Sequence, residues 1–353
     1  MKSIRRGQVS AAMRRLVLSL AVALSVGIAV ANDAAAAVLR MFATTTTNRL
    51  ITFSSTSGTL TSDHAITGLS AGEVIGGIDF RPLTGDLYGI AKGASGIRIV
   101  KLDIGTGAAT VVSPAPLNIA GTAFGMSFEG TADRIRLVSD ANVNLRISPD
   151  TGLSTNTDTP LFYPAGDPSA GTTPSVVHLG MSNDVPLGVG TFFGIDTASS
   201  KLVRLGDPQG APFSPSSGRL TTIAVVNAAM SNKLGGLDIN PVDGTMYAVF
   251  HLIGGPLPQL YKLIDGEMIG LFSIATGGAA IDGFALARVD DCNDIDGNGK
   301  VEALTDALLY MRALFGLTGT AVTDNAIGAG ATRATWAQIR DHMNAQCGMS
   351  WAQ

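Results

Sequence analysis

The sequence predicts an all-β repeat domain, a five-bladed β-propeller closed by a shared blade, followed by a small α-helical module at the C-terminal end. Three observations lead to this fold class. A hairpin motif occurs twice, short β-type runs recur between residues 38 and 287, and the pattern then changes from strand-like to helix-like after residues 288–293. We therefore expect a repeat domain at 38–287, a linker at 288–293 and a helical module at 294–349.

The hairpin motif reads GGIDFRPLTGDLYGI at residues 76–90 and returns as GGLDINPVDGTMYAV at residues 235–249. Pro82 presets φ for the first central residue of a turn, and Gly85 supplies the positive φ that lets the chain reverse. The apolar runs on either side then form paired strands. A hairpin that recurs within one chain indicates a repeat fold.

Aligned on one another, the repeats give five units of four strands, with a period of about 40 to 50 residues, which is typical of a propeller blade. A glycine recurs in the opening strand, and a second column, mostly aromatic, recurs in the second strand. The glycines are Gly77, Gly125, Gly180, Gly236 and Gly283, and the second column is Phe42, Tyr88, Arg136, Phe193 and Tyr247.

The two ends of the repeat region complement each other. Phe42 has no opening strand before it, and the opening strand around Gly283 has no partner strands after it. One blade is thus split between the two ends, and pairing them closes the ring and removes exposed strand edges. An open solenoid or a stacked sandwich is the alternative, but an open solenoid would not gain from this split.

The first 31 residues have the pattern of a secretory signal peptide. Basic residues between Lys2 and Arg15 precede an apolar run at 16–30, and Ala29-Val30-Ala31 forms a small-x-small cleavage site. Cleavage within the alanine run at 34–37 and an uncleaved membrane anchor are the alternatives, although the apolar run is shorter than the roughly 20 residues of a span. We expect a secreted protein, extracellular or periplasmic.

Without residues 1–31 the chain keeps 19 Lys and Arg against 28 Asp and Glu, a net charge near −9. An acidic surface without basic runs argues against nucleic acid or an anionic membrane as partner. No later segment is apolar enough to span a bilayer, so we expect a soluble mature protein.

GIDFRPLTGDLYGI, followed by DRIRLVSDANVNLRISPDTG at 133–152, resembles a bacterial family of exported domains known only as a domain of unknown function, DUF4394. The resemblance covers about residues 38–287. It implies a propeller-like exported module and brings no reaction or catalytic residue with it.

The C-terminal module opens with a D-x-D-x-N-G run, which is typical of the first half of an EF-hand calcium loop. Alternate oxygen ligands can turn inward around Ca²⁺, and glycine allows the sharp bend. The closing acid comes one residue later than in an EF-hand, and an Asp/Gly-rich turn before a helix is the alternative. The predicted ligands are Asp294, Asp296, Asn298, Lys300 through its carbonyl, Glu302 and Asp306.

Two helices are predicted after this loop. Leu304, Leu308, Met311 and Phe315 form the apolar face of the first. The second begins at Thr335 with a capping box completed by Gln338, and carries an apolar stripe of Trp336, Ile339 and Met343. The only cysteines, Cys292 and Cys347, lie at the two ends of the module, and in an exported chain we expect one disulfide between them. Free thiols or a metal pair are the alternatives.

DIDGNGKVEALTDALLYMRALFGLTG resembles the dockerin family, calcium-dependent modules that attach exported proteins to cohesin partners. The resemblance covers about residues 290–350 and assigns calcium to Asp294, Asp296, Asn298 and Asp306. A dockerin has two calcium repeats, whereas residues 323–331 lack the second acidic loop, so cohesin binding does not follow.

The sequence contains no H-E-x-x-H motif, no phosphate loop and no G-x-S-x-G elbow between a strand and a helix. GLSAG at residues 68–72 matches the letters G-x-S-x-G, but it lies between β-type runs. Asp79 and Asp238, each two residues after an opening-strand glycine, are the most suggestive polar pair. They are expected either to face a central channel or to accept backbone hydrogen bonds in their own hairpin turns.

The favoured hypothesis is an exported non-catalytic binding protein, in which the propeller recognises a glycan or other surface ligand and the calcium module attaches to another extracellular protein. The alternative is an extracellular propeller-type hydrolase or lyase acting on a polysaccharide or other polymer. The sequence offers no catalytic residue for it.

Overall fold

The computed structural model describes residues 39–182, 188–226, 230–241, 243–255, 257–264, 267–287, 294–297 and 302–329, residues 331, 333–347, 349 and 351. The predicted signal peptide, the linker and Asn298, Lys300 and Cys292 lie outside these residues. No helix within the described ranges is both long and apolar enough to cross a membrane.

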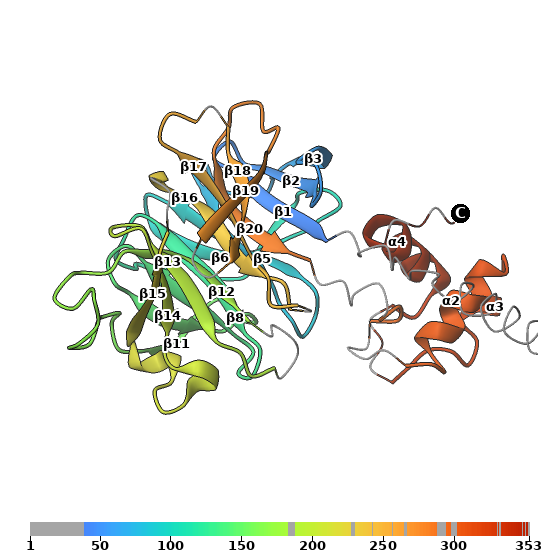
Figure 1. Ribbon diagram of the computed structural model, residues 1–353. Helices are drawn as coiled ribbons and strands as arrows, with labels where there is room; N and C mark the ends of the chain where they lie inside the picture. The colour runs from blue at the N-terminus through green and yellow to red at the C-terminus, as the bar shows by residue number, and fades with distance from the viewer. Residues whose placement is uncertain are drawn as a thin grey trace, which may run out of the picture. The chain divides into compact units, whose positions relative to one another are not determined.

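Twenty strands of the described chain form five antiparallel sheets of four strands, which confirms the predicted five-bladed propeller (Figure 1). Blade 1 is β20 (Ile281–Leu286), β1 (Arg40–Thr45), β2 (Arg49–Ser54) and β3 (Leu60–Ala65). Blade 2 is β4 (Val74–Phe80), β5 (Leu87–Gly93), β6 (Gly96–Leu102) and β7 (Ala109–Val111).

The other three blades follow in chain order. Blade 3 is β8 (Phe124–Glu129), β9 (Arg134–Ser139), β10 (Asn144–Ile147) and β11 (Ser154–Thr157). Blade 4 is β12 (Val176–Met181), β13 (Phe192–Asp196), β14 (Lys201–Leu205) and β15 (Leu220–Val225), with short 3₁₀ turns η1 (Pro208–Gly210) and η2 (Pro215–Ser217) before β15. Blade 5 is β16 (Met230–Ile239), β17 (Met246–Leu252), β18 (Gln259–Ile264) and β19 (Glu267–Ser273).

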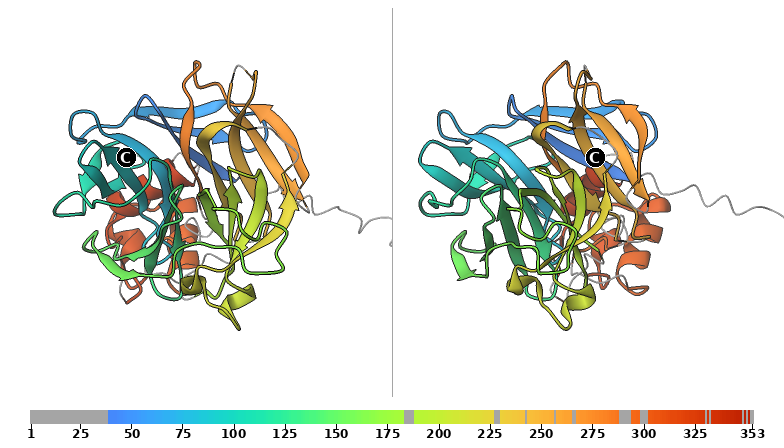
Figure 2. Two further views of the ribbon diagram at one scale, coloured as in Figure 1. Left: turned by 90° about the vertical axis from the view of Figure 1, so that its left-hand side faces the viewer. Right: turned by 60° about the vertical axis from the view of Figure 1, so that its left-hand side comes forward.

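The shared blade is present as predicted. β20, the last strand, pairs with β1, the first, with Ala285 opposite Phe42, and the two lie side by side in Figure 1. Figure 2 shows the blades arranged around one axis. Because the ends of the repeat region complete one sheet, the ring closes through the hydrogen bonds of that sheet.

The predicted turn chemistry also holds. Gly85 and Gly244, at the tips of the two matching hairpins, both have φ near 72°. In the first hairpin the Gly85 N–H donates to the Arg81 carbonyl at 2.8 Å. This is the left-handed conformation for which glycine is the least strained residue.

The first strand of each blade lies on the axis, and neighbouring inner strands touch in the order β4, β8, β12, β16, β20 and back to β4. All five predicted glycines lie on these strands. A hydrophobic core fills each junction between adjacent blades; together these cores hold most of the buried apolar side chains. We call the end where the inner strands begin the entry face, and the opposite end the exit face.

One member of the second-strand column, Phe193, was misplaced when the repeats were aligned on one another. Tyr88 and Tyr247 lie opposite Asp79 and Asp238, two residues after the glycines. Phe193, however, lies opposite Gly180 itself. The repeat that forms blade 4 has Ser182 where the hairpin motif has its aspartate. With this weaker match, sequence spacing alone shifted the register by two residues.

The helical module contains α2 (Asp306–Leu314), α3 (Thr320–Thr323) and α4 (Trp336–Gln346), packed around a small core of its own. The capping box of α4 is confirmed: the Thr335 side chain accepts from the Gln338 N–H, and Gln338 accepts from Thr335. Ile339 and Met343 are buried as predicted.

The predicted apolar face of the first helix is only partly correct, because Leu308 packs against the core of the module and the other three residues do not. Leu309 and Ala313 are buried, whereas Leu304, Met311 and Phe315 are 82%, 52% and 79% exposed. α2 begins only at Asp306, so Leu304 precedes it. The i, i+4 row that includes Leu309 and Ala313 faces the core, while the stripe through Met311 faces outward.

Candidate functional site

The two predicted carboxylates lie near the exit face of the propeller, on β4 and β16, and are buried. Asp79 accepts the N–H of Phe80 at 2.8 Å and the N–H of Phe128, on β8, at 2.7 Å. Asp238 accepts the N–H groups of Ile239 and of Leu286, on β20, both at 2.7 Å. Each aspartate therefore joins its own inner strand to the inner strand of the next blade.

This geometry refines the sequence alternatives. Each carboxylate accepts one N–H from its own hairpin strand and one from the next blade. An inner strand has no neighbouring strand of its own sheet on the axis side, so its N–H groups on that side need other acceptors. Burial raises the pKa of Asp79 to about 7. Burial, and then the negative charge of Asp79, raises the pKa of Asp238 well above its usual value. The two carboxylates thus share one electrostatic environment.

The inner-strand glycines let the strands approach one another around the axis. A Cβ built on Gly125 would lie 2.8 Å from the Val177 backbone on β12, and one on Gly236 would lie 2.7 Å from the Phe284 nitrogen on β20. One on Gly283 would lie 3.1 Å from the Gly77 nitrogen on β4. The predicted glycine column is thus a packing requirement of the ring.

The entry face carries a polar pocket of about 360 Å³ above blade 4. Its lining is Asp140, Thr173, Pro174, Ser175, Thr197, Ala198 and Lys233. The Lys233 ammonium, from blade 5, donates to Asp140, from blade 3, at 2.7 Å. Burial opposes ionisation of Asp140, but Lys233 and the N–H groups of Thr122 and Ala123 outweigh it and lower its pKa to about 2. The pocket therefore combines hydroxyl groups with a fixed ion pair.

Among the described histidines, His178 on β12 has the pKa that departs most from its ordinary value. It is buried against Phe250, with 5.1 Å between the ring centroids. Burial lowers its pKa to about 3, which keeps the ring neutral at ordinary pH. It packs at the junction between blades 4 and 5.

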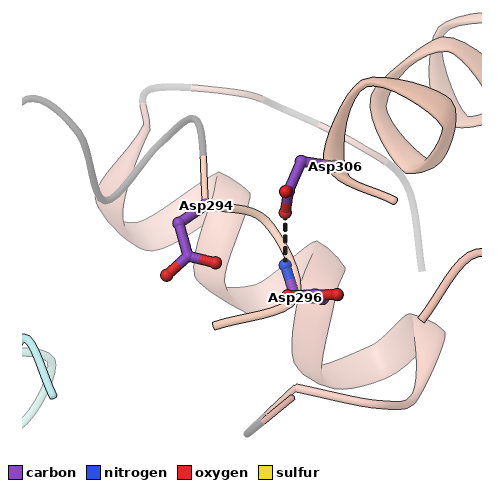
Figure 3. A group of neighbouring side chains, drawn as sticks. All are labelled: Asp294, Asp296 and Asp306. Atoms are coloured by element: carbon purple, nitrogen blue, oxygen red, sulfur yellow. Dashed lines mark hydrogen bonds between the residues drawn. The ribbon is translucent and has the colours of Figure 1, made fainter. Parts of the chain in front are cut away.

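The acidic loop of the helical module brings three of the predicted calcium ligands together (Figure 3). One oxygen from each of Asp294, Asp296 and Asp306 lies within 4.8 Å of the others. Asp306, at the start of α2, turns back toward the loop, so the extra residue before it does not prevent closure. Glu302 is not part of this group, although it was predicted as a ligand.

Asp306 is also the hydrogen-bonding centre of this loop. One carboxylate oxygen accepts the N–H groups of Ile295 at 2.6 Å and Asp296 at 3.1 Å. The other accepts the Glu302 N–H at 2.9 Å and the Thr305 hydroxyl at 3.1 Å. A carboxylate offers about four acceptor positions, so these donors occupy all of them.

The rest of the module holds the loop from the other side. Asp296 accepts the Gly328 N–H at 2.6 Å. Arg333 donates from its side chain to the carbonyls of Asp294 and Ile295. Cys347, at the end of α4, carries no free thiol. Because Cys292 lies outside the described residues, its pairing with Cys347 stays a prediction.

The family model described as "Domain of unknown function (DUF4394)" matches residues 49–285, about two thirds of the chain. The chain belongs to the DUF4394 family. The match begins in blade 1 at β2 and ends within β20, so the DUF4394 domain of this chain corresponds to the propeller. No curated protein matches the chain.

The chain is also similar to several solved structures. One is from a nidogen/laminin complex, with a TM-score of 0.45 and 11% identity over 70% of this chain and 98% of its own. A PQQ-bound aldose sugar dehydrogenase from Streptomyces coelicolor has a TM-score of 0.38 and 15% identity, over 71% of this chain and 83% of its own. A structure from Bacteroides uniformis that is assigned as a 6-phosphogluconolactonase has a TM-score of 0.33 and 16% identity, over 69% of this chain and 70% of its own. At these scores none is a basis for assigning a ligand or reaction.

Sequence reasoning missed two arginines of the DUF4394 domain. Arg136 is fully buried in a column that is otherwise aromatic, and it donates to Asn144, Asp158 and Glu129. A lone arginine in an aromatic column was the available signal. Its guanidinium also lies 5.5 Å from the centre of the Phe192 ring on blade 4, so it joins two blades.

Arg81 directly follows β4, within the first hairpin motif, and joins blade 2 to blade 3. Its Nε donates to Asp133 at 2.8 Å, and its Nη1 donates to Asp150 at 2.8 Å. Asp133 and Asp150 lie in the second family motif, residues 133–152. The two motifs that carried the family resemblance are therefore in contact with each other.

Proposed function

We propose that this DUF4394 protein is an exported, non-catalytic binding protein. The propeller is its recognition domain, and the C-terminal module, of dockerin type, is an attachment unit stabilised by Ca²⁺ and by a disulfide between Cys292 and Cys347. The observation that carries the proposal is the convergence of Asp294, Asp296 and Asp306 at the start of α2. The leader-like residues 1–31 support export.

The residues present fit a hard cation. Three carboxylates so close together repel one another. A bound Ca²⁺ would offset this repulsion, because its charge is positive and its preferred ligands are carboxylate and carbonyl oxygens. Since Asp306 is fully engaged with N–H and hydroxyl donors, we assign the ligand role to Asp294 and Asp296. Asn298 and the Lys300 carbonyl would add ligands from the part of the loop outside the described residues. Asp306 then holds the loop closed around them.

Calcium should stabilise the module of the full chain. Calorimetric unfolding with Ca²⁺ and with chelator should give a higher melting temperature for the module in Ca²⁺, because a ligand that binds only the folded state at about 100 times its Kd adds about 2.7 kcal/mol. Asp294→Asn and Asp296→Asn should remove this gain. Asp324→Asn, an exposed acid of the same module, is the control and should keep it. Unfolding that chelator leaves unchanged contradicts the proposal.

The polar pocket on the entry face is the proposed recognition site of the propeller. Its threonine and serine hydroxyls and the Lys233–Asp140 ion pair supply the donors and acceptors that a hydroxyl-rich ligand such as a glycan requires. The aspartates at the exit face support a non-catalytic role, because their oxygens are buried and bonded to backbone N–H groups.

A screen of soluble oligosaccharides and polysaccharides, read for both binding and turnover, tests this role. Lys233→Ala should weaken binding of a glycan hit at least tenfold. Lys101→Ala, a similarly exposed lysine paired with Asp86, should bind as the unaltered chain does. Turnover of any polymer by the unaltered chain would establish the hydrolase or lyase alternative instead.

A further inference from the structure

The loop between the third and fourth strands of blade 4 is longer than its counterparts. It spans residues 206–219, whereas the matching loops of blades 2 and 3 span residues 103–108 and 148–153. Because β14 runs in the same direction as the inner strand β12, this loop lies at the exit end of blade 4. It is therefore separate from the polar pocket on the entry face.

Backbone contacts hold this long loop in one shape. Gly206 turns the chain with a φ of 74°, and the Asp207 N–H donates to the Phe213 carbonyl at 2.7 Å. The Asn144 side chain of blade 3 donates to the Pro215 carbonyl at 3.0 Å. The loop thus presents its side chains from a fixed support, which lowers the entropy cost of binding a ligand.

Three side chains meet on this support, and we call Phe162, Phe213 and Arg219 the arginine platform. The Arg219 guanidinium carbon lies 4.6 Å from the centre of the Phe213 ring. Arg219 also forms a parallel β-bridge with Phe162, in which the Leu220 N–H donates to the Phe162 carbonyl at 2.9 Å. Residues paired in this way place their side chains on the same face. Both phenyl rings of the platform are 43% exposed.

The guanidinium of Arg219 has no acidic or carbonyl partner in the described part of the chain. Its Nε is buried and accepts no place in any hydrogen bond there. Other arginines of the propeller, such as Arg81 and Arg98, are bonded to acids. A guanidinium is a planar fork of N–H donors whose geometry fits a carboxylate. Arg219 therefore holds an unused fork in a fixed position against Phe213.

We propose that the arginine platform binds a sugar that carries a carboxylate, such as a uronate within an oligosaccharide. The carboxylate pairs with the Arg219 guanidinium, and the apolar C–H faces of the sugar rings lie on the exposed phenyl rings. The choice of a sugar rests on the proposed function of the propeller as a glycan-binding domain. The platform adds to that function a second contact site and the chemical class of one sugar.

The surroundings of the platform favour an acidic sugar over a polyanion or a peptide. One isolated arginine on an acidic chain suits a single anionic group, and salt screens the more distant charges beyond about 8 Å. A peptide would need a free strand edge, but the edge of β15 is already covered here. The Leu220 N–H donates to Phe162, and the Thr222 N–H donates to Asp167 at 2.8 Å. Exposed rings without a free edge suit a sugar instead.

The test uses the full chain without residues 1–31 and two xylo-oligosaccharides of equal length, one of which carries a single glucuronate group. Isothermal titration calorimetry should show that the acidic oligosaccharide binds at least tenfold more tightly than the neutral one. Arg219→Gln should remove this difference, because it removes the charge and the fork. Arg49→Gln is the matched control, an exposed arginine already paired with Asp63, and should keep the difference.

Two further variants examine the parts of the platform. Arg219→Lys keeps the charge but loses the planar fork, so it should retain only part of the preference for the acidic oligosaccharide. Phe213→Ala should weaken binding of the acidic oligosaccharide, because it removes the ring that holds the guanidinium. If Arg219→Gln fails to fold by circular dichroism, Arg219→Lys takes its place as the weakening variant.

Several outcomes would overturn the proposal. These are no binding of the acidic oligosaccharide, equal affinity for the two oligosaccharides, and a preference that Arg219→Gln leaves intact. Tighter binding of hexaglutamate than of the acidic oligosaccharide would make the ligand a peptide. Weakening by Lys233→Ala but not by Arg219→Gln would place the acidic sugar in the entry-face pocket, which would overturn the platform and leave the proposed function in place.

Discussion

At the scale of single residues, the two aspartates at the exit face set the electrostatic character of the ring. Asp79 and Asp238 each satisfy two inner-strand N–H groups, and each joins two neighbouring blades. Burial of these carboxylates is costly when they are ionised, because a low-dielectric environment penalises charge. The buried positions from which these carboxylates join the blades therefore make the ring sensitive to pH.

This sensitivity has a definite sign. The pKa of Asp79 is about 7 in the folded chain and about 3.9 in an unfolded chain. Between these values the folded state binds more protons, so the contribution of the pair to the free energy of unfolding is full at low pH and falls as pH rises toward 7. Asp238, whose pKa is also raised, acts in the same direction.

Urea unfolding at a series of pH values measures this contribution. Relative to the unaltered chain, Asp79→Asn should be destabilised most at low pH, where it has lost one N–H acceptor, and progressively less as pH rises toward 7. Asp243→Asn, on the exposed turn after β16, is the control and should follow the unaltered chain. A difference between Asp79→Asn and the unaltered chain that is constant with pH would contradict the assignment.

At the scale of elements, the strands were predictable and the helix face was not. The glycine column located all five inner strands, because an inner strand can approach the next one only where a side chain is missing, as at Gly125 and Gly236. In the helical module, apolar spacing predicted an inward stripe through Met311 that instead faces outward. A short helix with apolar residues on two faces offers no sequence signal for which face packs.

The same distinction applies to the candidate sites. The grouping of acidic residues in the loop was predictable because Asp294 and Asp296 lie close together in sequence, and Asp306 lies beside them despite the extra residue. The entry-face pocket was not, because Asp140, Thr197 and Lys233 come from three different blades. Only the ring brings them together, and a repeat pattern gives blade order without giving which loop residues meet.

At the scale of the whole molecule, the ring depends on its last strand. β20 supplies the inner strand of blade 1 and contributes Phe284 and Leu286 to the core between blades 5 and 1. Ala285 also joins the core between blades 1 and 2. Removing β20 would therefore open two junctions and expose the edge of β1.

Two truncations of the chain test this dependence. A chain ending after residue 287 keeps β20 and should unfold cooperatively, because all five junctions remain. A chain ending after residue 280 loses β20, and it should lose cooperative unfolding or aggregate through the exposed edge of β1. Thermal unfolding followed by circular dichroism, together with the soluble fraction after expression, measures both. Since the chains differ by only seven residues, equal cooperativity and solubility would mean that β20 does not close the ring.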